Sequence, residues 1–127
     1  MYLLDSNAVI ACLNTGEQAI TNLIVQADAV YLSAVVVDEL LFGALASGCT
    51  EQNLKVLNTF ISENAVLMID QDTARVYADV RLKLKRLGRP IPENDLWIAA
   101  TAIQHNLMLV TRDAHFSAIE LLSVRSW

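Results

Sequence analysis

The segment P-I-P-E-N-D-L-W-I-A-A-T-A-I-Q-H-N-L-M-L-V-T-R-D, from Pro90 to Asp113, organises the rest of the chain. Its first half has the apolar spacing of a helix over about Leu96 to Ile103, which Asn94 or Asp95 can cap. The run from Leu107 to Val110 is typical of a short buried strand, and a two-residue turn separates it from the helix. The segment therefore predicts a helix that returns directly into a strand.

The lengths of these two elements bring two carboxylates together. A helix of about ten residues rises roughly 15 Å, and a strand of about five residues spans roughly 16 Å. The strand should therefore end beside the start of the helix, which places Asp113 close to Asp95. Neighbouring carboxylates repel each other unless a cation or a shared proton offsets their charge. This segment alone is explained equally well by a metal site or acid/base pair and by a helix cap followed by a turn.

Short apolar runs alternate with amphipathic helical patterns along the whole chain. This order predicts an α/β fold, a three-layer α/β/α sandwich around a central, mostly parallel sheet of four to five strands. The expected strands are residues 2–4, 29–32, 65–69 and 107–110, with an edge strand at 121–124. A long helix should begin near Asp72 and end at Gly88. With 127 residues, no linker and no repeat, residues 1–127 should form a single domain.

Acidic residues gather at one predicted edge of the sheet. Asp5 follows the first strand, Asp113 follows the fourth, and Asp95 opens the helix that leads into the fourth. In the helix after the second strand, Asp38 and Glu39 both have apolar neighbours at helical spacing, so periodicity does not choose between them. Parallel sheets bind ligands beyond the carboxyl ends of their strands. Convergence of four acids there favours chemistry over helix capping alone.

The nitrogen and sulfur side chains give no sign of a metal site. Cys12 and Cys49 are isolated, without the spacing of a zinc site, and should be reduced and packed. His105 and His115 flank different elements and are interpreted as structural. Metal chemistry should therefore rest on oxygen ligands, which suit Mg²⁺ or Mn²⁺.

Charge is distributed unevenly along the chain. The net charge is −5, yet five of the nine basic residues fall in one helical segment: Arg81, Lys83, Lys85, Arg86 and Arg89. This segment is either an ordinary solvated helix face or a track for a phosphate backbone. The apolar content of 54% favours a partner or self-association surface. No apolar run has the length of a membrane span and no signal segment is evident, so a cytoplasmic location is expected.

With these residues assembled, the chain resembles the PIN-domain nucleases, and most closely their VapC-type toxin branch. The similarity covers nearly the whole length and depends on four motifs in order. They are L-L-D-S-N at 3–7, S-A-V-V-V-D-E-L-L-F-G-A at 33–44, G-R-P-I-P-E-N-D-L-W-I-A-A-T-A at 88–102 and L-V-T-R-D-A-H-F at 109–116. Each motif alone is weak, but their order and spacing together are specific.

The resemblance implies roles for particular residues. The family's acidic quartet corresponds to Asp5, Glu39, Asp95 and Asp113, which favours Glu39 over Asp38. Supporting polar positions correspond to Ser6, Asn7 and Thr111, and an accessory acid corresponds to Glu93. Residues that border the family's groove correspond to Arg81, Lys85, Arg86 and Arg89. The implied activity is Mg²⁺- or Mn²⁺-dependent hydrolysis of RNA phosphodiester bonds by a homodimeric endoribonuclease, held inactive by a cognate antitoxin.

Three other functions fit less well. A phosphohydrolase with an aspartyl nucleophile at Asp5 commonly needs a second Asp two residues later, where this chain has Asn7. A receiver-like signalling domain could use Asp5 and Asp70, which follow the first and third strands. It also needs an acidic pair near the first strand and a lysine late in the chain, and no lysine follows Lys85. A PIN scaffold used only for binding would not need all four acids.

Overall fold

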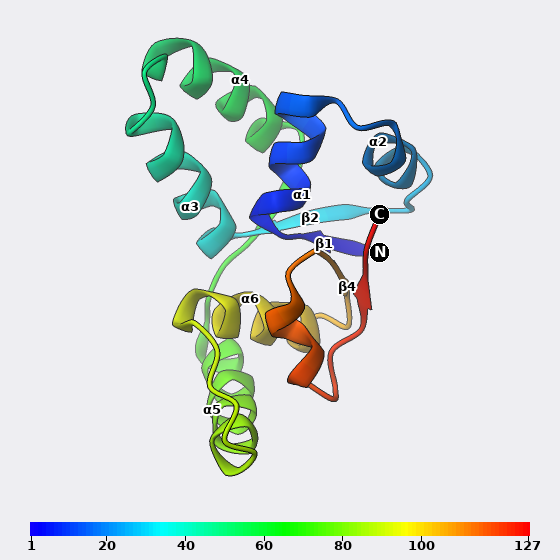
Figure 1. Cartoon of the computed structure of the whole chain (residues 1–127), viewed down its shortest axis with the longest axis vertical. Helices are drawn as coiled ribbons and strands as arrows, with labels where there is room; N and C mark the ends of the chain where they lie inside the picture. Colours follow the sequence, from blue (N-terminus) through cyan, green and yellow to red (C-terminus); the bar gives the residue numbers. More distant parts are fainter.

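The computed structural model describes residues 1–127 and contains one sheet of five parallel strands in the order β3-β2-β1-β4-β5 (Figure 1). The strands are β1 (Tyr2–Leu4), β2 (Val30–Ser33), β3 (Ala65–Leu67), β4 (Met108–Val110) and β5 (Val124–Arg125). The predicted α/β fold with a central parallel sheet is confirmed. The expected edge strand exists, but it begins at Val124 rather than at Leu121.

Helices cover both sides of this sheet. They are α1 (Ser6–Ile10), η1 (Ala11–Thr15), α2 (Gln18–Val25), α3 (Ala34–Leu45), α4 (Thr50–Ser62), α5 (Gln71–Arg86), α6 (Glu93–Gln104) and the 3₁₀ turn η2 (Ala114–Ala118). In Figure 1, α1, α3 and α4 lie above the strands, whereas α5 and α6 lie below them. No single helix is long and apolar enough to cross a membrane; by length and composition alone, only the bent pair Ser6–Thr15 and Gln18–Val25 would.

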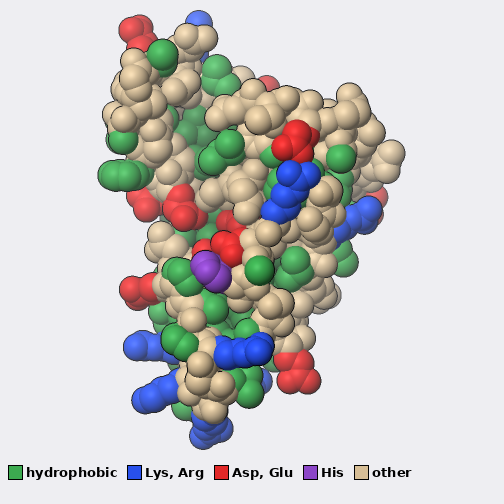
Figure 2. Space-filling model, in the orientation of Figure 1, with side chains coloured by type: hydrophobic (Ala, Val, Ile, Leu, Met, Phe, Trp, Pro, Cys, Tyr) green, Lys and Arg blue, Asp and Glu red, His purple; other side chains and the backbone are tan.

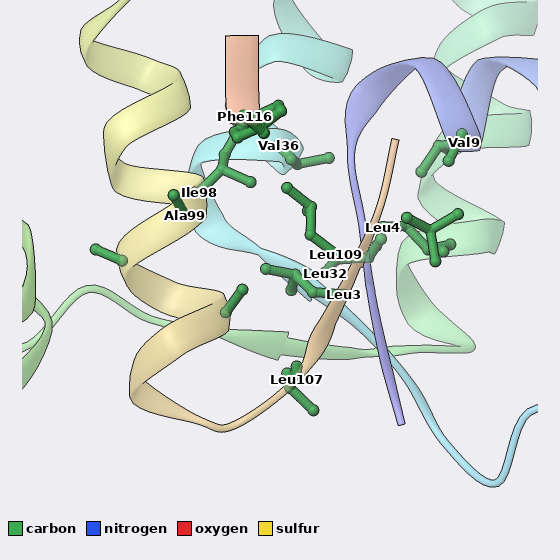
Figure 3. Packing of buried hydrophobic residues seen from close by; sticks show 14 of the residues in the cluster. Leu3, Leu4, Val9, Leu32, Val36, Ile98, Ala99, Leu107, Leu109 and Phe116 are labelled. Atoms are coloured by element: carbon green, nitrogen blue, oxygen red, sulfur yellow. The ribbon is translucent and has the colours of Figure 1, made fainter. Parts of the chain in front are cut away.

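The core lies where the central strands meet α3, α6 and η2. Leu3 pairs in register with Tyr31 on one side and with Leu109 on the other, and Leu3 and Leu109 are fully buried. Figure 3 shows the strand leucines packed beside side chains of α6 and the ring of Phe116. Burial of a large apolar side chain contributes about 1.5–3 kcal/mol. These contacts hold the carboxyl ends of β1 and β4 side by side.

The helix that organises the chain begins earlier than its sequence pattern indicates. The pattern predicts Asn94 or Asp95 as the cap, but α6 already begins at Glu93, with Pro92 in the cap position. Proline tolerates this place because its fixed φ suits a helix start and no amide hydrogen is needed there. Asp95 therefore lies inside the first turn, and its carboxylate is free for other contacts.

The other boundaries follow local chemistry. The long helix α5 is capped by Asp70, whose Oδ1 accepts a hydrogen bond from the backbone N–H of Thr73 at 3.0 Å, rather than near Asp72. The helix ends at Arg86, and Gly88 follows two residues later with a φ of +67°, which is the terminating role that the sequence predicts for this glycine. The turn between α6 and β4 uses Asn106 at a φ of +54°, a conformation that Asn also tolerates.

Candidate active site

Asp5 lies at the carboxyl end of β1 and is only 5% exposed. Its Oδ1 accepts a hydrogen bond from the backbone N–H of Ser6 at 2.8 Å, and its Oδ2 accepts one from the hydroxyl of Thr111 at 2.6 Å. The backbone N–H of Asp5 donates to the carbonyl of Val110 at 3.0 Å, which ties the ends of β1 and β4 together. Asp5 is thus held rigidly between the two central strands.

Thr111 connects three elements through one hydroxyl. Besides donating to Asp5, the hydroxyl oxygen accepts from the backbone N–H of Asp113 at 3.0 Å and from Nδ2 of Asn7 at 3.4 Å. The Oδ1 of Asn7 is buried and has no hydrogen-bond partner in the protein. A buried acceptor without a donor costs about 1–3 kcal/mol, so such atoms usually face a ligand or water.

Glu39 reaches the same region from the second turn of α3. This helix is capped by Ser33, whose Oγ accepts the backbone N–H of Val36 at 3.1 Å. The hydroxyl of Ser6 donates to Oε1 of Glu39 at 2.8 Å. Asp38, its neighbour, makes no such contact, so geometry resolves the ambiguity that the sequence leaves: Glu39 is the residue that faces the site.

Asp95 and Asp113 come together around His115. The Nδ1 of His115 lies 3.0 Å from Oδ2 of Asp95 and 3.2 Å from Oδ1 of Asp113. The predicted proximity of Asp95 and Asp113 is therefore present. His115, which the sequence pattern alone assigns a structural role, is in direct contact with both. Asp113 caps η2 by accepting the backbone N–H of His115 at 2.9 Å, which brings the residue two positions later back beside it.

The sequence D-A-H at residues 113–115 could indicate that His115 lies beside Asp113. The interpretation of His115 as structural does not use this signal. An Asp that forms a turn with its own backbone two residues later places that later side chain next to its carboxylate. Figure 2 shows the result as acidic side chains gathered around a histidine near the middle of one face. The groups that meet there therefore include one imidazole nitrogen beside the carboxylate oxygens, which the expectation of oxygen ligands does not include.

The clustered carboxylates are electrostatically strained. Burial raises the pKa of Asp5, and the charges of Asp95 and Asp113 raise it further against the opposing hydrogen bonds from Thr111 and Ser6. Burial likewise raises the pKa of Glu39, with contributions from the neighbouring carboxylates. The pKa of Asp95 is also raised by burial, and the contact with His115 only partly offsets this. Such a set favours protonation or a bound cation.

Glu93 lies at the start of α6, outside the four clustered acids. Its Oε1 is 3.4 Å from the hydroxyl of Tyr77, whose ring stacks on that of Trp97 at 3.8 Å between centroids. Burial raises the pKa of Tyr77, as does the charge of Glu93, whereas Arg81 lowers it. Glu93 is exposed, and its hydrogen bond is to Tyr77 rather than to the quartet, so it stands at the rim of the site.

The basic segment forms the exposed end of α5 and the turn after it. Arg81 lies one helical turn after Tyr77 and its charge acts on that residue, whereas Lys85, Arg86 and Arg89 lie farther along and form no ion pair with the acids. In Figure 2, Lys and Arg side chains occupy the end of the molecule that α5 forms in Figure 1. Of these basic residues, Arg81 is therefore the one whose charge acts on a residue that contacts Glu93.

A groove leads away from the site on the other side. It has a volume of about 640 Å³ and runs between α1, α3 and α4. Ser6 and Glu39 stand at the end next to the acids, and Gly43, Leu40 and Val56 line its apolar part. A chain segment lying in this groove would reach Glu39.

The donor set fits a divalent cation. Asp95, Asp113 and His115 each offer a ligand atom, and these atoms lie within 4.8 Å of one another. Asp5 and Glu39 are close enough for their charges to act on the same region. The unpartnered Oδ1 of Asn7 adds a further acceptor beside Thr111. A cluster of acceptors with raised carboxyl pKa values is the environment that a bound cation stabilises.

Comparisons with known proteins agree with this geometry. The sequence model of the PIN domain family matches residues 2–122. Ribonuclease VapC5 of Mycobacterium tuberculosis is 35% identical over 120 residues, which cover 93% of this chain and 87% of that protein. Ribonuclease VapC2 of Rickettsia felis is 30% identical over 131 residues, covering 100% and 98% of the two chains. In the crystal structure of VapBC2 from Rickettsia felis bound to a DNA fragment from their promoter, one chain superposes with a TM-score of 0.92 at 29% identity, covering 99% and 98%.

Proposed function

Because the chain belongs to the PIN domain family, we propose that it is a divalent-metal-dependent endoribonuclease that acts as the toxin of a toxin–antitoxin pair. The observation that carries this proposal is the convergence of Asp5, Glu39, Asp95 and Asp113 beyond the carboxyl ends of β1, β2 and β4. Relatives named Ribonuclease VapC, aligned over nearly the whole chain, support RNA as the substrate.

The four carboxylates, with Asn7 beside them, would hold Mg²⁺ or Mn²⁺. When bound, the cation supplies charge neutralisation at the phosphate and makes water a stronger nucleophile at neutral pH. Asp5 is pinned by Thr111 and Ser6, so its orientation costs little entropy when substrate arrives. Glu93 at the rim, or Asp95, can accept a hydrogen bond from the attacking water and orient it.

The same arrangement explains how an acidic protein can act on RNA. The net charge is −5, and an empty acidic cluster repels phosphate. Two features would reverse this: a bound cation inverts the local charge, and Arg81 lies close enough for its charge to act on Tyr77, whose hydroxyl contacts Glu93. We propose that the substrate backbone passes from the acids toward Arg81, Lys85, Arg86 and Arg89.

Neutralising Arg81 and Lys85 together should raise KM for RNA several-fold at low salt and leave kcat nearly unchanged, because these cations bind the backbone rather than the scissile bond. The slope of log KM against log salt should fall by about 0.7 for each phosphate of a single strand that the variant no longer neutralises. Lys55→Gln on α4, an exposed lysine outside this patch, is the matched control. Equal effects of both changes would argue against a defined track.

The test of the proposed function is induced expression followed by sequencing of new RNA ends, together with cleavage of the identified RNA by the purified protein. We expect growth arrest and cuts at a defined site. Arrest without RNA cleavage, or cleavage unaffected by removal of divalent cations, would contradict the assignment. The homodimer and the cytoplasmic location remain predictions, which sedimentation and cell fractionation can check.

We propose that an antitoxin segment occupies the groove between α1, α3 and α4 and covers Glu39. The neighbouring solved structures are toxin–antitoxin complexes, which supports a partner of this kind. A Cβ added at Gly43 would meet no atom within 4 Å, so the backbone there has room for a side chain, and Gly43→Gln should fold and extend its amide into the groove. Coexpressed antitoxin should relieve growth arrest by the parent protein and fail to relieve arrest by Gly43→Gln. Full relief in both would exclude this groove.

A further inference from the structure

His115 is the one member of the cluster to which the proposed function assigns no role. Its Nδ1, rather than the outer ring nitrogen, points at Oδ2 of Asp95 and Oδ1 of Asp113. A single proton on Nδ1 can be donated in a strong bond to only one of these oxygens. A neutral ring with its lone pair on Nδ1 would instead face two negative charges, unless a cation lies among the three atoms.

The distances fit donor atoms around one cation. Ligands in neighbouring positions of an octahedral ion with bonds of about 2.1 Å lie about 3.0 Å apart. The separations of Nδ1 from the two carboxylate oxygens are 3.0 and 3.2 Å. All three donor atoms lie within 4.8 Å of one another. The imidazole would therefore need little movement to share an ion with both carboxylates.

The chain also holds His115 in place. It lies in the first turn of η2, where its backbone N–H donates to Asp113 at 2.9 Å. The next residue, Phe116, is 1% exposed and anchors the turn in the core, as Figure 3 shows. A ligand on a fixed backbone needs little ordering when a metal binds, and supported side chains of this kind make precise sites.

We propose that Nδ1 of His115 is itself a metal ligand, together with Asp95 and Asp113, and that the site therefore prefers a first-row transition-metal cation to Mg²⁺. The inference rests on the proposed metal-dependent function. Mg²⁺ strongly favours oxygen ligands and keeps much of its water, whereas first-row transition-metal ions accept imidazole nitrogen more readily. The nitrogen thus tunes which ion the carboxylates hold.

The test uses Mn²⁺ as a paramagnetic probe on the purified full-length chain after chelation and dialysis. The sequence contains two histidines, so a coordinated imidazole can be assigned by two substitutions. Pulsed electron paramagnetic resonance should detect directly coordinated ¹⁴N in the parent protein and in His105→Gln, whose exposed side chain lies at the end of α6. The ¹⁴N signal should be absent in His115→Gln, although Mn²⁺ still binds to the carboxylates.

Metal titrations supply the second measurement. His115→Gln should weaken Mn²⁺ binding about tenfold or more and Mg²⁺ binding by less than about threefold. Mn²⁺ that binds without a ¹⁴N signal in the parent protein would show that His115 is only a counter-ion, which overturns this inference and leaves the ribonuclease proposal standing. Absence of both Mn²⁺ and Mg²⁺ binding at the carboxylates would overturn this inference and the metal-dependent function together.

Discussion

Replacing Asp5 or Asp95 by Asn should lower the rate of RNA cleavage by about 10³-fold or more, because each change removes one carboxylate from the proposed metal site. Asp5 is the most constrained of the four acids, buried between Thr111 and Ser6, so no other side chain can take its place. The measurement is single-turnover cleavage of a defined RNA with Mn²⁺ or Mg²⁺ present in excess.

The fold should survive these substitutions. An Asn at position 5 can still accept the backbone N–H of Ser6 through its oxygen, so one of the two side-chain hydrogen bonds that hold Asp5 is kept. Asp38→Asn on α3 is the matched control, since Asp38 lies one residue before Glu39 and outside the site. It should cleave at the parental rate. Circular dichroism and thermal melting check folding, and substantial cleavage by both Asp5→Asn and Asp95→Asn would exclude the site as described.

Several features of the site could be predicted because they follow from backbone geometry. Parallel strands end at one edge of a sheet, so acids that follow β1 and β4 must meet wherever the strands pair. The paired lengths of α6 and β4 return Asp113 to the start of the helix, even though both elements have boundaries that differ from the pattern. Differences of a few residues at the ends do not disturb this convergence.

Other features depend on side-chain directions that periodicity does not contain. The choice of Glu39 over Asp38 depends on how α3 faces α1, which is visible in the hydrogen bond from Ser6. The contact of His115 with two carboxylates depends on a local turn capped by Asp113. The buried Oδ1 of Asn7 depends on where Thr111 directs its hydroxyl. Each is a contact between elements, which no single segment specifies.

Without a divalent cation, the protein should become less stable as pH rises from about 4 toward neutrality. Chelation of the cation should also abolish RNA cleavage. Asp5, Glu39 and Asp95 have pKa values raised above their ordinary values of 3.8 and 4.5, chiefly by burial. The folded state therefore binds more protons than the unfolded state between the ordinary and the raised values, so the free energy of unfolding falls as pH rises. The hydrogen bond to Asp95 also raises the pKa of His115, so a further loss of stability is expected as pH rises above the ordinary pKa of 6.5.

At lower pH, Asp70 should make stability change in the opposite direction. Hydrogen bonds from Thr73 lower the pKa of Asp70, so its contribution is present above its ordinary value of 3.8 and is lost as pH falls through the lowered value. Stability should thus have a maximum in mild acid. Asp5→Asn removes one of the strained carboxyls, and the metal-free variant should lose less stability than the parent between mild acid and pH 7.

Mn²⁺ should restore the stability that the metal-free protein loses at neutral pH. The bound ion would offset the repulsion among the clustered carboxylates, which otherwise decreases only when they bind protons. At a free concentration of about 100 times Kd, a ligand specific for the folded state adds about 2.7 kcal/mol, which corresponds to a rise in Tm of roughly 10 °C for a chain of this size. The rise should be large at pH 7, smaller near pH 5 where protons compete for the carboxylates, and strongly reduced in Asp5→Asn. Calorimetry with and without Mn²⁺ at both pH values measures all three, and an equal rise in the parent and the variant would show that the ion binds elsewhere.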